Sequence, residues 1–171
     1  MRTNLRLFTA LLGVLALGVL VLGTGVAAAD GDRGKTLRLG AELLQEEFLD
    51  LGDTGPSLGD QLVFSETLFK GHRDVGQSGG VCSITHAVPP YDVLTLQCVV
   101  TLSLQRGQIT LQGLIEVQGE DDPGPFRLAI TGGTGQYRGA GGEATFRERD
   151  TGLGVYRLRF DAKKNGHHRR R

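Results

Sequence analysis

The chain has 171 residues, enough for one domain, and its 19 acidic and 19 basic residues give no formal net charge at pH 7. The basic residues do not form a stripe interleaved with aromatic residues, which argues against a general nucleic-acid-binding role. Five of them lie among residues 163–171, where we expect a disordered, solubilising tail; the weaker alternative is that the tail contacts an anionic surface.

The first residues have the features of a targeting segment. Arg2 and Arg6 precede an apolar run over residues 7–22, and three alanines end the segment at Ala29. This pattern predicts a signal peptide over residues 1–29, cleaved near Ala29, and therefore a secreted protein. The alternative is an uncleaved membrane anchor, because the apolar stretch nearly reaches the roughly 20 residues that a membrane span requires.

The next segment is ambiguous. Residues 35–51 fit both an alternating strand and a helical stripe, so their periodicity leaves the structure open. A turn over residues 53–57 then precedes a predicted strand over residues 61–69. Glu66 lies on the apolar face of that strand, together with Phe64.

Alternating apolar and polar residues predict six more strands after a polar, glycine-rich connection over residues 71–80. These strands cover residues 81–86, 93–105, 109–117, 126–131, 143–149 and 155–160. Short, turn-rich links join them, and no long helix interrupts them. Strands this numerous indicate an all-β fold, either an antiparallel sandwich or a closed barrel.

Residues 129–143 contain six glycines around Tyr137 and Arg138. A phosphate-binding loop would need Gly-Lys-Ser/Thr, or a G-x-G-x-x-G pattern that opens a helix, and neither is present. An alternating segment follows instead. We therefore expect a tight corner between two strands.

The two cysteines allow a test of strand pairing. If Pro89 and Pro90 form the centre of a hairpin, opposed residues have numbers that sum to about 180, as Cys82 and Cys98 do. Directly opposed residues lie about 4.5 Å apart, within reach of a disulfide, and a secreted chain favours oxidation. The alternatives are two buried thiols or a metal pair, but two sulfurs without nearby histidines make a weak zinc site. We predict a disulfide and no metal.

Four motifs occur in a characteristic order, with Ala129-Ile130-Thr131-Gly132-Gly133 the most specific. They cover residues 59–69, 75–82, 112–113 and 126–140. This order resembles the allene oxide cyclase and dirigent superfamily, in the form of a bacterial-type secreted member. The resemblance implies an eight-stranded antiparallel β-barrel over residues 30–162, with an apolar lumen, no cofactor, and assembly as a homo-oligomer, a dimer or trimer.

The resemblance also implies which side chains enter the lumen. Plant allene oxide cyclases carry an Asn at the position of Glu66 and a lumen Tyr at the position of Ile115, and these departures argue against allene oxide cyclisation itself. Desolvation would raise the pKa of Glu66 and suit it to acid or base catalysis; the alternative is a structural carboxylate, paired with Arg or hydrogen-bonded across the barrel. Tyr137 either lines the lumen mouth or braces the corner. The expected ligand-binding residues are Phe64, Glu66, Leu96, Ile115 and Tyr137.

Two functions follow as hypotheses. In the first, the secreted barrel binds a small hydrophobic molecule and steers its cyclisation or stereoselective coupling, as an isomerase-like enzyme in which Glu66 assists. In the second, side chains fill the lumen, and the protein is a non-catalytic extracellular or envelope-associated module. An open apolar cavity would favour the first, and a packed lumen the second.

Overall fold

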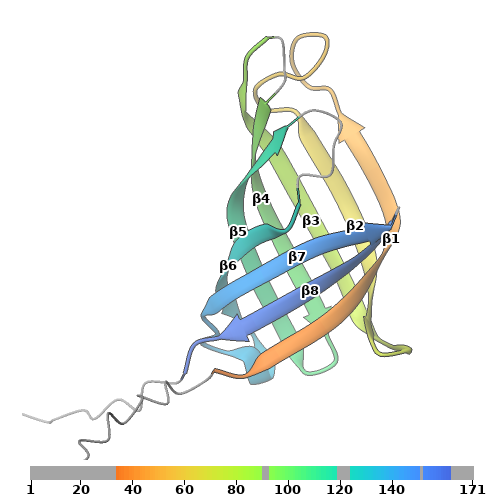
Figure 1. Cartoon of the computed structure of the whole chain (residues 1–171), viewed down its shortest axis with the longest axis vertical. Helices are drawn as coiled ribbons and strands as arrows, with labels where there is room; N and C mark the ends of the chain where they lie inside the picture. Colours follow the sequence, from red (N-terminus) through yellow and green to blue (C-terminus); the bar gives the residue numbers. More distant parts are fainter. Residues whose placement is uncertain (1–33, 90–92, 119–123, 151, 163–171) are drawn as a thin grey trace, which may run out of the picture. The chain divides into compact units, whose positions relative to one another are not determined.

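The computed structural model describes residues 34–89, 93–118, 124–150 and 152–162 (Figure 1). The predicted signal peptide and the basic tail lie outside the described residues, so cleavage, secretion and surface contact stay predictions. Among the described residues, no helix is long and apolar enough to cross a membrane.

The described residues form eight strands that close into one antiparallel barrel (Figure 1). Each strand pairs with its neighbours in the chain, and β1 also pairs with β8, so the sheet has no free edge. The prediction of an eight-stranded antiparallel barrel is confirmed. The strands are β1 (Thr36–Leu49), β2 (Gln61–Lys70), β3 (Arg73–Ala87), β4 (Val93–Leu104), β5 (Gly107–Gln118), β6 (Phe126–Gly133), β7 (Gly142–Asp150) and β8 (Leu153–Phe160).

The ambiguous segment over residues 35–51 forms strand β1. Leu39 and Ala41 are buried at alternate positions, as in a strand with one face toward the core. The register against β2 shifts between Leu43 and Gln45, where a bulge adds one residue. The extra residue changes which positions face inward, so the strand alternation is interrupted and the sequence fits a helical stripe as well as a strand.

Strand β3 begins earlier than the sequence suggests. Residues 71–80 were expected to form a connection, but β3 starts at Arg73. Its inward positions include Ser78 and Gly80, which supply no large apolar side chain and so hide the alternation. Larger side chains of β2 use the space, because Phe64 pairs with Gly80 in the register of the two strands.

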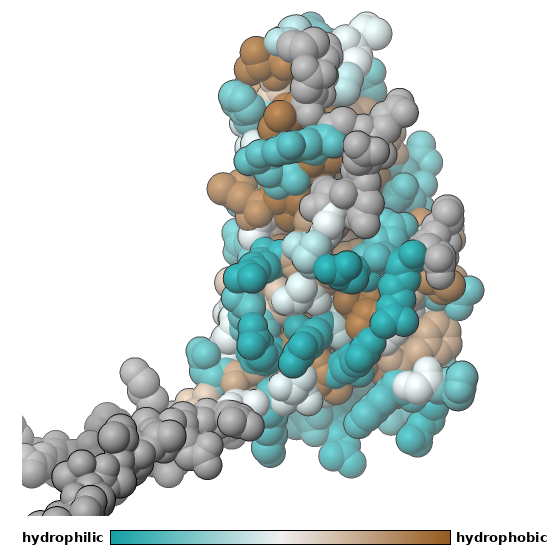
Figure 2. Space-filling view, viewed as in Figure 1, coloured by the Kyte–Doolittle hydropathy of each residue, from teal (hydrophilic) through white to brown (hydrophobic). Residues whose placement is uncertain are grey.

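One end of the barrel is solidly packed. Its fully buried residues come from every strand except β3, whose partly buried Val75 packs against them, and this core lies toward the β2–β3 and β4–β5 turns. The buried side chains of this end include Leu39, Leu68, Leu102, Ile109, Leu111, Ile130, Ala144 and Leu158. On the outside, hydrophilic side chains cover the face over β7 and β8 (Figure 2), where Arg147 and Arg157 are exposed.

The glycine-rich corner between β6 and β7 closes this packed end. It contains the short 3₁₀ turn η1 (Gly135–Tyr137), and the amide of Gln136 donates to the carbonyl of Arg106 at 2.9 Å. Gly135 has φ of +57°, and a Cβ there would lie 2.2 Å from the same carbonyl oxygen. The prediction of a strand-to-strand corner is confirmed, and close backbone approach is the reason for its glycines.

Candidate functional site

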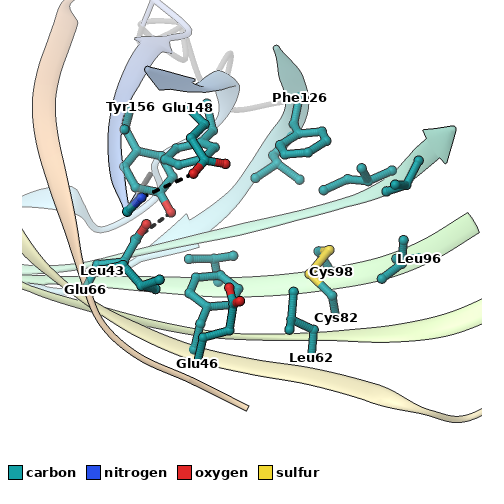
Figure 3. A pocket seen from close by; sticks show the side chains of 18 of the residues that line it. Leu43, Glu46, Leu62, Glu66, Cys82, Leu96, Cys98, Phe126, Glu148 and Tyr156 are labelled. Carbon is teal, nitrogen blue, oxygen red and sulfur yellow. Dashed lines mark hydrogen bonds between the residues drawn. A yellow bond between two sulfur atoms is a disulfide. The ribbon is translucent and has the colours of Figure 1, made fainter. Parts of the chain in front are cut away.

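The other half of the barrel contains a cavity of about 280 Å³ (Figure 3). All eight strands contribute apolar side chains to its wall, and partly exposed side chains such as Leu153 mark its opening to the surface. The apolar lining residues are Leu43, Leu62, Phe64, Leu96, Val100, Ile115, Val117, Phe126, Leu128, Phe146 and Leu153, with Cys82 and Cys98. This half of the lumen is therefore open and apolar.

Glu66 is the buried polar group of this wall. Only 5% of the residue is exposed, and its Oε2 accepts hydrogen bonds from the hydroxyls of Ser78 and Tyr156, the latter at 2.8 Å. Burial raises the pKa of Glu66 above its ordinary value of 4.5, although both hydrogen bonds oppose this shift. The negative charge of Glu148 raises this pKa further.

The hydroxyl of Tyr156 is protonated at neutral pH. Burial and the adjacent Glu66 carboxylate together raise the pKa of its hydroxyl well above the ordinary value of 10.0. The phenol is therefore a hydrogen-bond donor at neutral pH. The group formed by Ser78, Glu66 and Tyr156 thus combines a carboxyl group of raised pKa with two hydroxyl donors.

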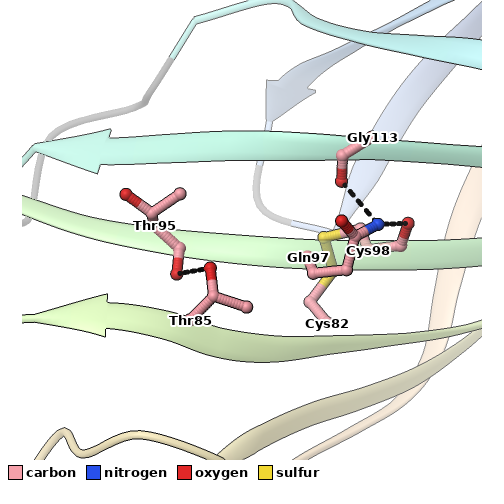
Figure 4. Close-up of a disulfide and its surroundings, with 6 residues drawn as sticks. All are labelled: Cys82, Thr85, Thr95, Gln97, Cys98 and Gly113. Carbon is pink, nitrogen blue, oxygen red and sulfur yellow. Dashed lines mark hydrogen bonds between the residues drawn. A yellow bond between two sulfur atoms is a disulfide. The ribbon is translucent and has the colours of Figure 1, made fainter.

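The disulfide of the cavity wall has the predicted register. Cys82 pairs with Cys98 across β3 and β4, and their Cα atoms are 4.0 Å apart (Figure 4). The predicted disulfide is therefore present, and the alternatives of free thiols or a metal pair are wrong. Gln97 precedes Cys98 in β4, and its side-chain amide donates to the carbonyls of Cys98 and Gly113, both at 3.3 Å.

The structure brings four of the five predicted ligand-binding residues together around the cavity: Phe64, Glu66, Leu96 and Ile115. Tyr137 is not among the lining residues. It lies at the packed end of the barrel, where its ring stacks on Phe160 with centroids 6.2 Å apart. This placement corrects its assignment to the ligand-binding set and fits the bracing role.

The sequence analysis missed several residues of the site. Tyr156 and Ser78 hold Glu66, and two further carboxylates, Glu46 and Glu148, line the cavity where it reaches solvent. Tyr156 could have been found, because it shares the inward face of β8 with Leu158, and a buried tyrosine hydroxyl needs a partner. Within the described ranges, no cluster of three His, Cys, Asp or Glu side chains could hold a metal ion.

Comparisons with known proteins agree with this architecture. The model of the allene oxide cyclase barrel like domain matches residues 39–158. Among solved structures, a pyocyanin demethylase is 32% identical, with a TM-score of 0.65 over 74% of this chain and 100% of that one. A search of curated proteins gave no match.

Two more distant structures share the fold. The Diels-Alderase AbmU from Streptomyces koyangensis is 16% identical, with a TM-score of 0.56 over 80% of this chain and 73% of that one. A pterocarpan synthase dirigent protein is 15% identical, with a TM-score of 0.50 over 76% of this chain and 94% of that one. Because the family model spans most of the barrel, this chain belongs to the family of allene oxide cyclase barrel-like domains.

Proposed function

We propose that the barrel binds a small hydrophobic molecule in its open half and steers a rearrangement of that molecule, such as a cyclisation or a stereoselective coupling. The observation that carries this proposal is a buried carboxylate, Glu66, on the wall of an otherwise apolar cavity. A packed lumen would have favoured a non-catalytic module. The disulfide supports action in an oxidising compartment outside the cell.

The size of the cavity supports a compact ligand. An apolar cavity of about 150 Å³ is known to bind benzene. The cavity of about 280 Å³ is therefore large enough for a molecule of about two fused rings. Enclosure by apolar walls restricts the conformations of such a ligand, and holding a near-reactive conformer contributes much of the rate of an intramolecular reaction.

Glu66 supplies acid–base chemistry at one point of this wall. Burial raises the pKa of this carboxyl group, so a larger fraction of it is protonated, and able to donate to a ligand, than of an exposed carboxyl group at the same pH. Tyr156 and Ser78 fix the position of the carboxyl group, since both donate to the same oxygen atom. The remaining oxygen, Oε1, has no hydrogen bond to another described residue and is the atom we assign to the ligand.

A thermal-shift screen with fatty acids, polyenes, phenols and fused-ring aromatics tests ligand binding, because a ligand that binds only the folded state raises its stability. A matched pair of variants locates the site. Ile115→Trp should fill the cavity and abolish the shift, whereas Leu114→Trp, at an outward position that is 63% exposed, should retain it. A screen without any shift, or a shift that survives Ile115→Trp, would overturn the proposal.

A second candidate reaction comes from the relative that is 32% identical, a pyocyanin demethylase whose whole length this chain matches. Demethylation of pyocyanin is tested by incubating the protein with that compound and looking for a product that is lighter by one methylene unit. Conversion by the wild type and its loss in Glu66→Gln would favour this reaction over cyclisation or coupling. Binding without conversion would exclude it.

A further inference from the structure

The charged side chains of the cavity all have the same sign. Glu46, Glu66 and Glu148 line it, and no described lining residue is Lys, Arg or His. The single salt bridge among the described residues joins Arg159 to Glu143 on the outer face. The three cavity carboxylates therefore lack a cationic partner within the part of the chain that the structure describes.

The carboxylates are arranged along the depth of the cavity. All three line the cavity (Figure 3), and Glu46 and Glu148 are exposed whereas Glu66 is buried. The bulge in β1 brings Glu46 to the cavity, because it changes the inward positions after Leu43. Apolar walls beside charges of one sign concentrate ligands of the opposite sign at the entrance.

Aromatic side chains form a large part of the same wall. Four of the ten Phe and Tyr residues of the chain line the cavity: Phe64, Phe126, Phe146 and Tyr156. The rings of Phe126 and Phe146 are nearly parallel, with an interplanar angle of 3° and centroids 6.3 Å apart. Phe146 also contacts Tyr156, at a centroid distance of 4.6 Å. The faces of aromatic rings attract organic cations, most strongly where water is excluded.

From these observations we infer that the cavity selects a hydrophobic organic cation of about two aromatic rings. This inference rests on the proposed function, because it names the chemical class of the ligand in the same cavity. A neutral molecule would gain no electrostatic attraction from the acidic opening, and an anion would be repelled by it. A cation of about two rings satisfies both the acidic opening and the aromatic wall.

Three probes of nearly the same shape test the inference by isothermal titration calorimetry: N-methylquinolinium, neutral 1-methylnaphthalene and anionic 1-naphthoate. We expect the cation to bind at least about tenfold more tightly than the neutral isostere, and the anion to bind most weakly. Equal or tighter binding of 1-methylnaphthalene would overturn the inference and leave the hydrophobic-ligand proposal standing. If none of the three binds, the inference fails, and the hydrophobic-ligand proposal is decided by the thermal-shift screen.

Single variants identify the carboxylates responsible. Glu148→Gln and Glu46→Gln should each weaken binding of N-methylquinolinium severalfold without changing binding of 1-methylnaphthalene. Glu47→Gln is the matched control, since this exposed carboxylate neighbours Glu46 in β1 but does not line the cavity. If Glu47→Gln weakens binding of the cation as much as Glu46→Gln does, the preference for the cation comes from the general surface charge and not from the cavity. That result would contradict the inference.

Discussion

The hydroxyl of Tyr156 donates a hydrogen bond of 2.8 Å to Oε2 of Glu66, although 90 positions separate the two residues. Strand β1 lies between the strands that carry them, so the contact forms only when β8 has closed the barrel. Both side chains are buried, and each supplies the polar partner that the other needs. Closure of the fold and assembly of the cavity's polar group are therefore one event.

Replacing Tyr156 with Phe should raise the pKa of Glu66 further, because the hydrogen bond stabilises the charged carboxylate. The substitution should also lower the free energy of unfolding by about 1–2 kcal/mol. A ¹³C NMR titration of the Glu66 side-chain carboxyl measures the pKa. Tyr137→Phe is the control, since the ring of Tyr137 lies at the packed end of the barrel. This substitution should leave the titration of Glu66 unchanged. A lower pKa in Tyr156→Phe would contradict the prediction.

Glu66 should make the protein less stable as pH rises. Its pKa in the folded state lies above the ordinary 4.5, so the folded protein binds this proton more tightly than the unfolded chain does. The resulting stabilisation is complete below the unfolded pKa and is lost as pH rises through the folded pKa. Urea unfolding at a series of pH values should show wild type losing stability relative to Glu66→Gln across this window. A difference that stays constant with pH would refute the assignment.

Asp60 should show the opposite dependence. Its buried carboxylate organises the β1–β2 connection by accepting hydrogen bonds from the amides of Leu51, Gly52 and Ser57. These bonds, the one from Leu51 most of all, lower the pKa of Asp60. Stabilisation by Asp60 is therefore present above the unfolded pKa and is lost as pH falls through the folded pKa.

The Asp60→Asn variant tests this dependence. It should lower the urea midpoint at neutral pH and have a smaller effect in acid, where the wild-type carboxylate is itself protonated. Asp53→Asn, in the same connection but exposed and with no such hydrogen bond to another described residue, should change little at either pH. A loss of stability for Asp60→Asn that grows toward acidic pH would contradict the proposed role.

The sequence predicted those features that depend on local alternation or on one hairpin. The pairing of Cys82 with Cys98 follows from a single turn, and the inward position of Glu66 follows from its parity with Phe64. The hydrogen-bond partners of Glu66 depend on the pairing of strands that are far apart in the sequence. Tyr156 reaches it only through the register of β8 on β1, which no local pattern encodes.

Two other misses have local physical causes. Ser78 was missed because β3 carries small residues at its inward positions, beside larger side chains of β2. Small inward residues remove the apolar alternation by which strands are recognised. Glu46 enters the cavity because of a bulge, and a one-residue shift exchanges the two faces of a strand. Both features are visible only when neighbouring strands are paired.

Removal of the disulfide should destabilise the barrel without unfolding it. The bond joins residues 16 positions apart, and a loop of that size is worth about 3 kcal/mol in the chain-entropy account. The double variant Cys82→Ala, Cys98→Ala should therefore lose about 2–4 kcal/mol in urea unfolding. A reductant should reproduce much of this loss in wild type and have no effect on the variant. An unchanged midpoint in both experiments would show that the bond does not contribute to stability.

Gly80 should control the width of the cavity. A Cβ at this position would lie 2.4 Å from Cζ of Phe64, so Gly80→Ala must displace the ring, and the free space lies in the cavity. Gly154 stands in the same relation to Phe146, with Cζ also at 2.4 Å. Both substitutions should weaken ligand binding severalfold while the fold persists, because the end of a flexible side chain can move more easily than backbone.

Calorimetry with N-methylquinolinium and 1-methylnaphthalene measures this effect, and circular dichroism checks the fold. Gly79→Ala is the matched control. It lies one residue earlier in β3, is exposed, and a Cβ there would meet only the Phe64 carbonyl oxygen, at 4.0 Å. Binding should be unchanged in this control. If Gly80→Ala binds both probes as tightly as wild type, Phe64 does not limit the space available to a ligand, and the wall beside β3 is not part of the binding surface.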